Sequence, residues 1–198
     1  MSGPEHDDGP ERDGRRFGPL PLEAMDPAQR AVADAILSGP RGANTGLRGP
    51  FEALLHSPEL ASAAQQVGAH VRFGSSLPTA LNEMAIIMVA RRWTAQFEWW
   101  AHRRMAIGAG LDPAAADAIA EGRRPQLDGD GDAVYRFASE LIDRADVSDE
   151  AWDAVVSRWG KAGAIDLIGA VGYYTMVSMV LNVDRYPLPA GVEPLPPL

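Results

Sequence analysis

The chain contains no cysteine among its 198 residues. This absence excludes disulfide bonds, thiolate nucleophiles, zinc–thiolate sites and iron–sulfur clusters held by cysteine. Positive charge is also scarce, because 27 acidic residues outnumber 18 basic ones and leave a formal charge of −9. Proteins that bind phosphate backbones present clustered Lys and Arg. The dense basic group formed by Arg91-Arg92 and Arg103-Arg104 is too small to reverse this balance, so a nucleic-acid partner is not expected.

The sequence has no recognisable targeting signal and no clear membrane span. The first eight residues carry neither a basic start nor an apolar run, so a secretory signal is not expected and the cytoplasm is the expected location. Residues Leu167 to Val183 are uncharged and mostly apolar, but they are only just long enough to cross a bilayer. They also include glycines, tyrosines, Thr, Ser and Asn. We therefore expect a buried core helix or a subunit-interface helix here, and no membrane partner.

No stretch alternates with the period of two that marks a β-strand, so an all-α fold in a single domain is predicted. Pro residues after capping side chains mark several helix starts, as at Asp26-Pro27, Ser57-Pro58 and Asp112-Pro113. Glycines mark helix ends, as at Gly110 and Gly122. Together with apolar spacing these signals predict helices over about 27–37, 58–73, 79–91, 94–109, 113–121, 131–144, 149–159 and 161–182.

Composition divides the chain into three parts. Residues 1–19 are rich in Gly, Pro, Asp and Arg, which predicts a disordered N-terminal tail. Residues 20–185 form the predicted helical domain, with a glycine-rich loop between Ser38 and Pro50. Residues 186–198 contain repeated prolines, which predicts an extended tail suited to lying against another surface.

Glu98 and His102 lie four residues apart in the predicted helix 94–109, so their side chains share one face. A carboxylate can orient an imidazole and favour its protonated form, and such a pair can transfer protons near neutral pH. Trp93, Phe97 and Trp100 lie at helical spacing beside them. An ordinary surface ion pair next to a core stripe is the alternative interpretation.

Glu83 lies in an apolar stretch, Met84 to Met88, of the preceding predicted helix. A carboxylate there is either on the exposed side of the helix or buried with a partner that it needs. Glu83, Glu98 and His102 could also be three metal ligands. Di-iron helical proteins, however, use a Glu-x-x-His spacing in two copies, and here the spacing is one residue longer with no second copy. We therefore predict no metal.

The segments Phe73 to Trp93 and Phe97-Glu-Trp-Trp-Ala-His102, the latter followed by Ala109-Gly-Leu111, resemble two consecutive helices of the carboxymuconolactone decarboxylase and alkylhydroperoxidase D superfamily. That family carries an early Glu, an aromatic-Glu-Trp element and a His at this separation. The resemblance covers about residues 51–120. The peroxidase branch has a Cys-x-x-Cys pair where this chain has Ala95 and Glu98, so the chain resembles the cysteine-less decarboxylase branch. Asn82 replaces an Arg that is frequent in the family.

The resemblance implies a cofactor-independent decarboxylase whose substrate is a small carboxylated lactone or related acid. His102 would supply or move the proton, Glu98 would orient or assist it, and Glu83 would position the substrate or complete a relay. Trp99 would contact the substrate, and Arg91 or Arg92 would hold its carboxylate. The family also implies a homotrimer or homohexamer.

Two other interpretations of the same residues remain open. An isomerase, a dehydratase or a lactone hydrolase could use the same Glu–His pair. A non-catalytic helical ligand-binding or assembly protein is the third possibility, and it predicts no cavity next to His102.

Overall fold

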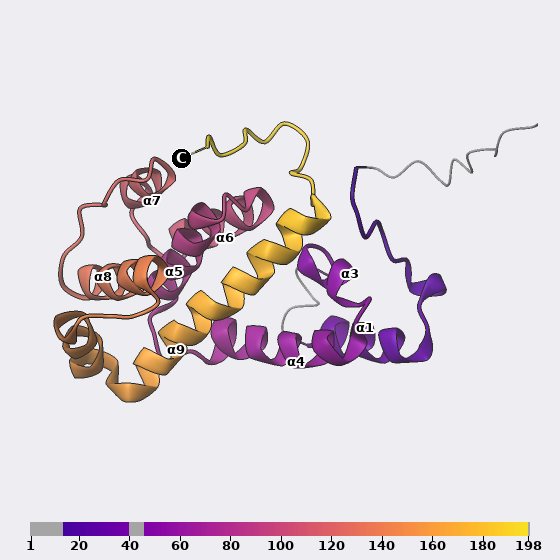
Figure 1. The fold of residues 1–198 in the computed structure, drawn as a ribbon, viewed down its shortest axis with the longest axis horizontal. Helices are drawn as coiled ribbons and strands as arrows, with labels where there is room; N and C mark the ends of the chain where they lie inside the picture. The colour runs from indigo at the N-terminus through magenta and orange to yellow at the C-terminus, as the bar shows by residue number, and fades with distance from the viewer. Residues whose placement is uncertain (1–13, 40–45, 198) are drawn as a thin grey trace, which may run out of the picture.

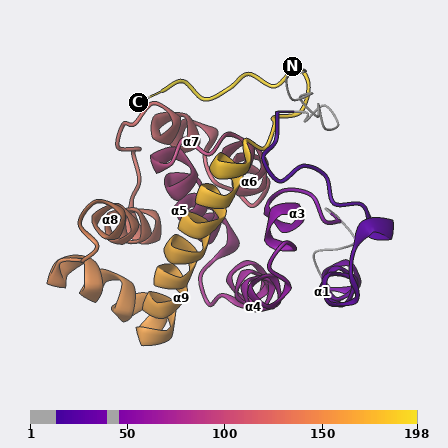
Figure 2. The same ribbon diagram turned by 45° about the vertical axis from the view of Figure 1, so that its right-hand side comes forward.

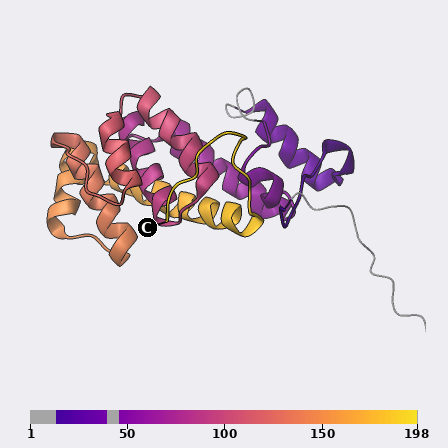
Figure 3. The same ribbon diagram turned by 90° about the horizontal axis from the view of Figure 1, so that it is seen from above.

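The computed structural model describes residues 14–39 and 46–197, which form an all-α structure without a strand in those ranges. The long helix α9 (Asp149–Asp184) crosses the whole molecule, with α5 (Thr79–Arg92), α6 (Gln96–Gly108) and α8 (Gly129–Arg144) along one side of it (Figures 1 and 2). On its other side lie α1 (Pro27–Ser38), α3 (Pro50–Leu54) and α4 (Pro58–Ala69). Seen from above, the molecule is elongated, with α1 and α8 near opposite ends (Figure 3).

Of the three predicted capping residues, Asp26 and Asp112 cap their helices, whereas Ser57 makes no side-chain capping hydrogen bond at α4. The side chain of Asp26 accepts a hydrogen bond from the Gln29 amide in a capping box at α1, and Asp112 caps α7 (Pro113–Ala120) through the Ala114 amide. The predicted helix to Phe73 is α4 continued by a π-helical turn, His70–Gly74. The short helix α3 falls at the end of the predicted loop and was missed, because five residues carry too little periodicity to detect. Residues 40–45 of that loop lie outside the described residues.

Helix α5 is the centre of the core. Every residue from Asn82 to Arg91 is buried, and the helix packs against α6, α7, α8 and α9. A helix that is apolar nearly all round has no solvent face, so it must be enclosed by others. Glu83 is buried, and His102 is its polar partner, which is the second of the two alternatives open from its sequence context.

Helix α9 is broken at Gly160, where the backbone adopts φ 66° and ψ −176°. A side chain would be strained at this positive φ, so glycine allows the change of direction between the two predicted helices 149–159 and 161–182. An 18-residue window of α9 is apolar enough to cross a membrane by length and composition alone, and 56% of that window is buried inside the structure. This is what a core helix of a soluble protein also shows, and the structure is compatible with a soluble protein.

The predicted N-terminal tail reaches into the fold at Arg15. This side chain is 5% exposed and pairs with Asp184 at the end of α9 (Nη2 to Oδ2, 2.6 Å) and with Glu52 of α3. Disorder was expected for residues 1–19. That expectation does not hold at Arg15, because two long-range carboxylates hold it and composition does not reveal such partners. Residues 1–13 lie outside the described residues.

Removing the Asp184 charge should destabilise the fold measurably. Asp184→Asn removes one of the two carboxylates that pair with the buried Arg15 guanidinium, and breaking a buried pair costs about 3 kcal/mol. Urea unfolding of both proteins, followed by circular dichroism, measures this change. The matched control is Asp130→Asn, which breaks an exposed pair with Arg158 and should cost less than about 1 kcal/mol. Equal losses in the two variants would contradict the assigned role of Arg15.

Candidate functional site

The turn between α5 and α6 brings Glu83 and His102 together. Thr94 adopts a left-handed conformation (φ 46°) between the two helices, and α5 and α6 pack along their lengths. Glu83 is ten residues before Trp93 and His102 is nine residues after it. Residues equally far from the turn of an antiparallel helix pair lie opposite each other. This geometry places the two side chains within reach across the helix interface.

The imidazole of His102 lies between two carboxylates. Its Nδ1 is 2.5 Å from Oε2 of Glu83 on α5, and its Nε2 is 2.8 Å from Oε1 of Glu98 one turn earlier on α6. The three residues are each at most 5% exposed. The ring of Tyr174 on α9 packs edge-on against the imidazole, with centroids 4.7 Å apart. Both ring nitrogens thus face a carboxyl oxygen, an arrangement that favours a proton on each of them.

Burial by itself disfavours the charged imidazole and lowers its pKa. The negative charges of Glu98 and Glu83, with their hydrogen bonds, outweigh that effect and raise the pKa of His102 from 6.5 to about 9. At neutral pH the site therefore contains an imidazolium between two acidic side chains. Such an arrangement stores a proton away from bulk water.

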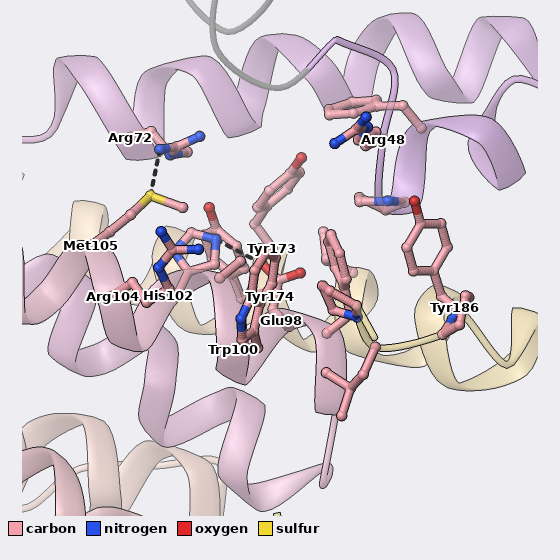
Figure 4. A pocket seen from close by; sticks show the side chains of 18 residues that line it. Arg48, Arg72, Glu98, Trp100, His102, Arg104, Met105, Tyr173, Tyr174 and Tyr186 are labelled. Atoms are coloured by element: carbon pink, nitrogen blue, oxygen red, sulfur yellow. Dashed lines mark hydrogen bonds and ion pairs between the residues drawn. The ribbon is translucent and has the colours of Figure 1, made fainter. Parts of the chain in front are cut away.

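A cavity of about 720 Å³ opens beside this group. Glu98 and His102 line it from α6, and Tyr173 and Tyr174 line it from α9 (Figure 4). Glu83 does not line this cavity. The proline-rich tail closes another part of the wall through Pro187–Pro189. The volume lies in the range of small-molecule sites.

The tail is attached at both ends of its course past the cavity. Tyr186 packs edge-on against Phe97, with ring centroids 4.6 Å apart. Further along, the Leu195 amide donates to Oε1 of Gln96, and Nε2 of Gln96 donates to the Leu195 carbonyl. The tail thus lies against α6, and its first residues form part of the cavity wall.

Three arginines line the cavity: Arg48, Arg72 and Arg104. None of them forms an ion pair with a described residue, whereas Arg15, Arg103, Arg123, Arg124 and Arg158 all do. Nη2 of Arg72 contacts Sδ of Met105 at 2.9 Å, and its Nε is buried without a hydrogen-bond partner. Arg72 and Arg48 lie apart along the cavity, with Tyr173 between them (Figure 4). The cavity therefore favours an anionic ligand.

The predicted substrate contacts Trp99, Arg91 and Arg92 do not line this cavity. Trp99 is 7% exposed and packs in the core, and Trp100 lines the cavity in its place. Adjacent residues of a helix point about 100° apart, so Trp99 points away from the cavity that its neighbour Glu98 lines. Arg91 is eight residues after Glu83, about 12 Å further along α5.

Sequence reasoning missed the arginines and the tyrosines that line the cavity. Tyr173 and Tyr174 stand out in the uncharged part of α9, but nothing local indicates which helix they face. Arg48 and Arg72 come from a loop and a π-helical turn, where no periodicity orients them. What marks these two arginines as site residues is that neither has a carboxylate partner among the described residues, and only the tertiary structure reveals this.

The acidic side chains do not converge as metal ligands. Glu83 and Glu98 approach opposite edges of the imidazole, and among the described residues no group of three His, Asp or Glu side chains could hold a metal ion. Charge-assisted hydrogen bonds to both ring nitrogens use the lone pair that a metal would need. The arrangement suits proton transfer.

No protein-family model, no curated protein and no solved structure matches this chain.

The raised pKa of His102 should make folding stability depend on pH. An unfolded imidazole titrates near 6.5 and the folded one at about 9. The stabilisation is therefore complete below about pH 6.5, and it is lost as pH rises through about 9, for a total of about 3 kcal/mol. Urea unfolding between about pH 6 and pH 10 measures it, with His102→Gln as the variant that lacks this dependence. An NMR midpoint near 6.5 for His102 would contradict the assigned charge state.

Proposed function

We propose that this chain is a cytoplasmic, cofactor-independent acid–base enzyme that decarboxylates a small carboxylated lactone or related acid in the 720 Å³ cavity. The observation that carries the proposal is the buried imidazole of His102, held between Glu83 and Glu98 and next to that cavity. The resemblance to the decarboxylase branch of the carboxymuconolactone decarboxylase family supports the reaction type.

Arginines without ion pairs support an acidic substrate. A guanidinium binds a carboxylate through two parallel hydrogen bonds, and Arg72 offers a buried Nε with no partner. Arg48 and Arg104 supply further positive charge around the same cavity. They take the role that the sequence suggested for Arg91 and Arg92. The rings of Tyr173, Tyr174 and Trp100 form the apolar walls that keep water away from a flat ligand.

The proposed reaction needs one proton, which the enolate takes up after CO₂ has left. When the bond to the leaving carboxylate breaks, its electron pair moves into the conjugated carbonyl of the substrate, and CO₂ and an enolate form. The enolate carbon then takes a proton, which passes from Nε2 of His102 through the carboxylate of Glu98. Glu98 reaches the cavity, whereas Glu83 holds the Nδ1 proton from behind and acts as a positioning residue. Solvent restores the proton afterwards.

The resemblance also suggests a homotrimer or homohexamer. Ile165, Met179 and Val183 are 65%, 43% and 48% exposed along one side of α9, which supports association through this helix. Sedimentation equilibrium of the full chain measures the assembly state.

Glu98→Gln and His102→Gln should each lower turnover of a carboxylated lactone by about 10²- to 10⁴-fold, because each removes a step of the proton route. Release of CO₂ from a panel of carboxylated lactones measures turnover, and circular dichroism checks helicity. Full activity in either variant would remove the proposal. If products form without CO₂, the same residues serve an isomerase, a dehydratase or a lactone hydrolase. Ligand binding without any product would indicate a non-catalytic binding protein.

Glu83→Gln tests the positioning role separately. It should lower kcat more than it changes KM, and it should shift the alkaline limb of the pH–rate profile to lower pH, because one of the two charges that raise the His102 pKa is gone. The matched control is His70→Gln, which removes the exposed His70–Asp166 pair and should leave the profile unchanged. An unchanged profile in Glu83→Gln would show that Glu83 has only a packing role.

A further inference from the structure

A second, smaller hollow lies at the far end of α5, where it meets α7 and α8. Its volume is about 150 Å³, and it shares no lining residue with the larger cavity. Met88 and Ile119 form part of its apolar floor, and Arg91, Arg92 and Arg123 line it. Three guanidinium groups therefore surround one small space in a protein that is acidic overall.

Arg91 is the unusual member of this group. It is 3% exposed, yet it forms no ion pair with any described residue. Its Nη1 makes one long contact, 3.5 Å from Oγ1 of Thr94, and its Nε is buried without a partner. Burial lowers the pKa of this guanidinium, but arginine remains charged in proteins. A buried cation without a counter-charge is costly unless a ligand supplies the missing anion.

The C-terminal end of α5 compensates only part of the desolvation cost of the buried Arg91 guanidinium. Arg91 and Arg92 lie in the last helical turn, where the helix dipole favours cations. This attraction is small compared with the desolvation of a buried ion. It also leaves the Nε donor of Arg91 unsatisfied. An anionic ligand with oxygen acceptors would supply the missing counter-charge and also accept a hydrogen bond from this Nε.

The rest of the lining fits the same ligand. Arg92 is exposed and forms no ion pair with a described residue, whereas Arg123 is paired with Glu121. Tyr135 and Ser139 of α8 add hydroxyl donors. Asp143 is the acidic member of the lining, so three cations and two anions, with the Glu121 that pairs with Arg123 included, leave a charge of +1 around the hollow.

We propose that this hollow is a binding site for a small oxyanion, a phosphate or carboxylate group, with Arg91 as its buried donor and Arg92 as its rim cation. A water molecule occupies about 30 Å³ of liquid, so the hollow holds a group of a few heavy atoms. Drug-sized ligands need about 300 Å³ or more. The site is separate from the proposed acid–base site, and it does not depend on the reaction proposed there.

The test is a titration of the ¹⁵N-labelled full chain with inorganic phosphate and, separately, with acetate, at constant ionic strength. The Nε–Hε resonance of Arg91, identified by its loss in Arg91→Lys, should shift and saturate at one equivalent per chain with at least one of the two anions. Arg92→Ala, at an exposed position that does not endanger folding, should weaken this binding by about tenfold. The preferred anion then distinguishes a phosphate group from a carboxylate as the natural ligand.

Arg72→Met is the matched control, because it removes a cation from the larger cavity and should leave the Arg91 titration unchanged. An Arg91 resonance that fails to move, or that drifts without saturation as it does with added chloride, overturns the proposal. An Arg92→Ala titration identical to that of the unmodified chain does the same. A resonance that responds to protein concentration and not to either anion would show that a carboxylate of a second copy fills the hollow, which also overturns it.

Discussion

The hydrogen-bonded group Glu83–His102–Glu98 is the interaction on which the site depends. Glu83 lies on α5, which is enclosed by its neighbours from Asn82 to Arg91, so its carboxylate has no route to solvent. A buried carboxylate needs a partner, and His102 provides it across the α5–α6 turn. Glu98 then holds the second nitrogen of the ring from the same helix. The interaction that permits a carboxylate in the core is thus also the one that stores a proton beside the cavity.

Residues from both ends of the described chain complete the surroundings of this group. The guanidinium of Arg15 lies over the ring of Tyr186, 4.5 Å from its centroid, while it pairs with Asp184 at the end of α9. Tyr186 in turn packs on Phe97, and the following residues Pro187–Pro189 line the cavity. The N-terminal segment therefore supports the segment that forms the cavity wall. Packing at Arg15 and the shape of the site are physically connected.

Arginine is used in two different ways in this acidic chain. Most described ion pairs of arginine are exposed and contribute little to stability. Arg48, Arg72 and Arg104 instead surround one hollow, and Arg91 and Arg92 border another, without carboxylate partners among the described residues. Unpaired guanidinium groups at concave surfaces are the features that attract anions. The net charge of −9 gives no indication of these two arginine-lined hollows.

Local sequence determined the helices and part of the site. Proline and capping residues marked the starts of α1, α4 and α7, Gly160 marked the break in α9, and the spacing of four put Glu98 and His102 on one face. These features depend on residues within about one helical turn of each other, so they can be read from the sequence alone. Tertiary structure alone decided that Trp100 and not Trp99 borders the cavity, that Arg91 lies at a different hollow from His102, and that Arg15 is buried. Each of these depends on how separate helices cross, and that follows from the packing of the whole core and not from the periodicity of any one segment.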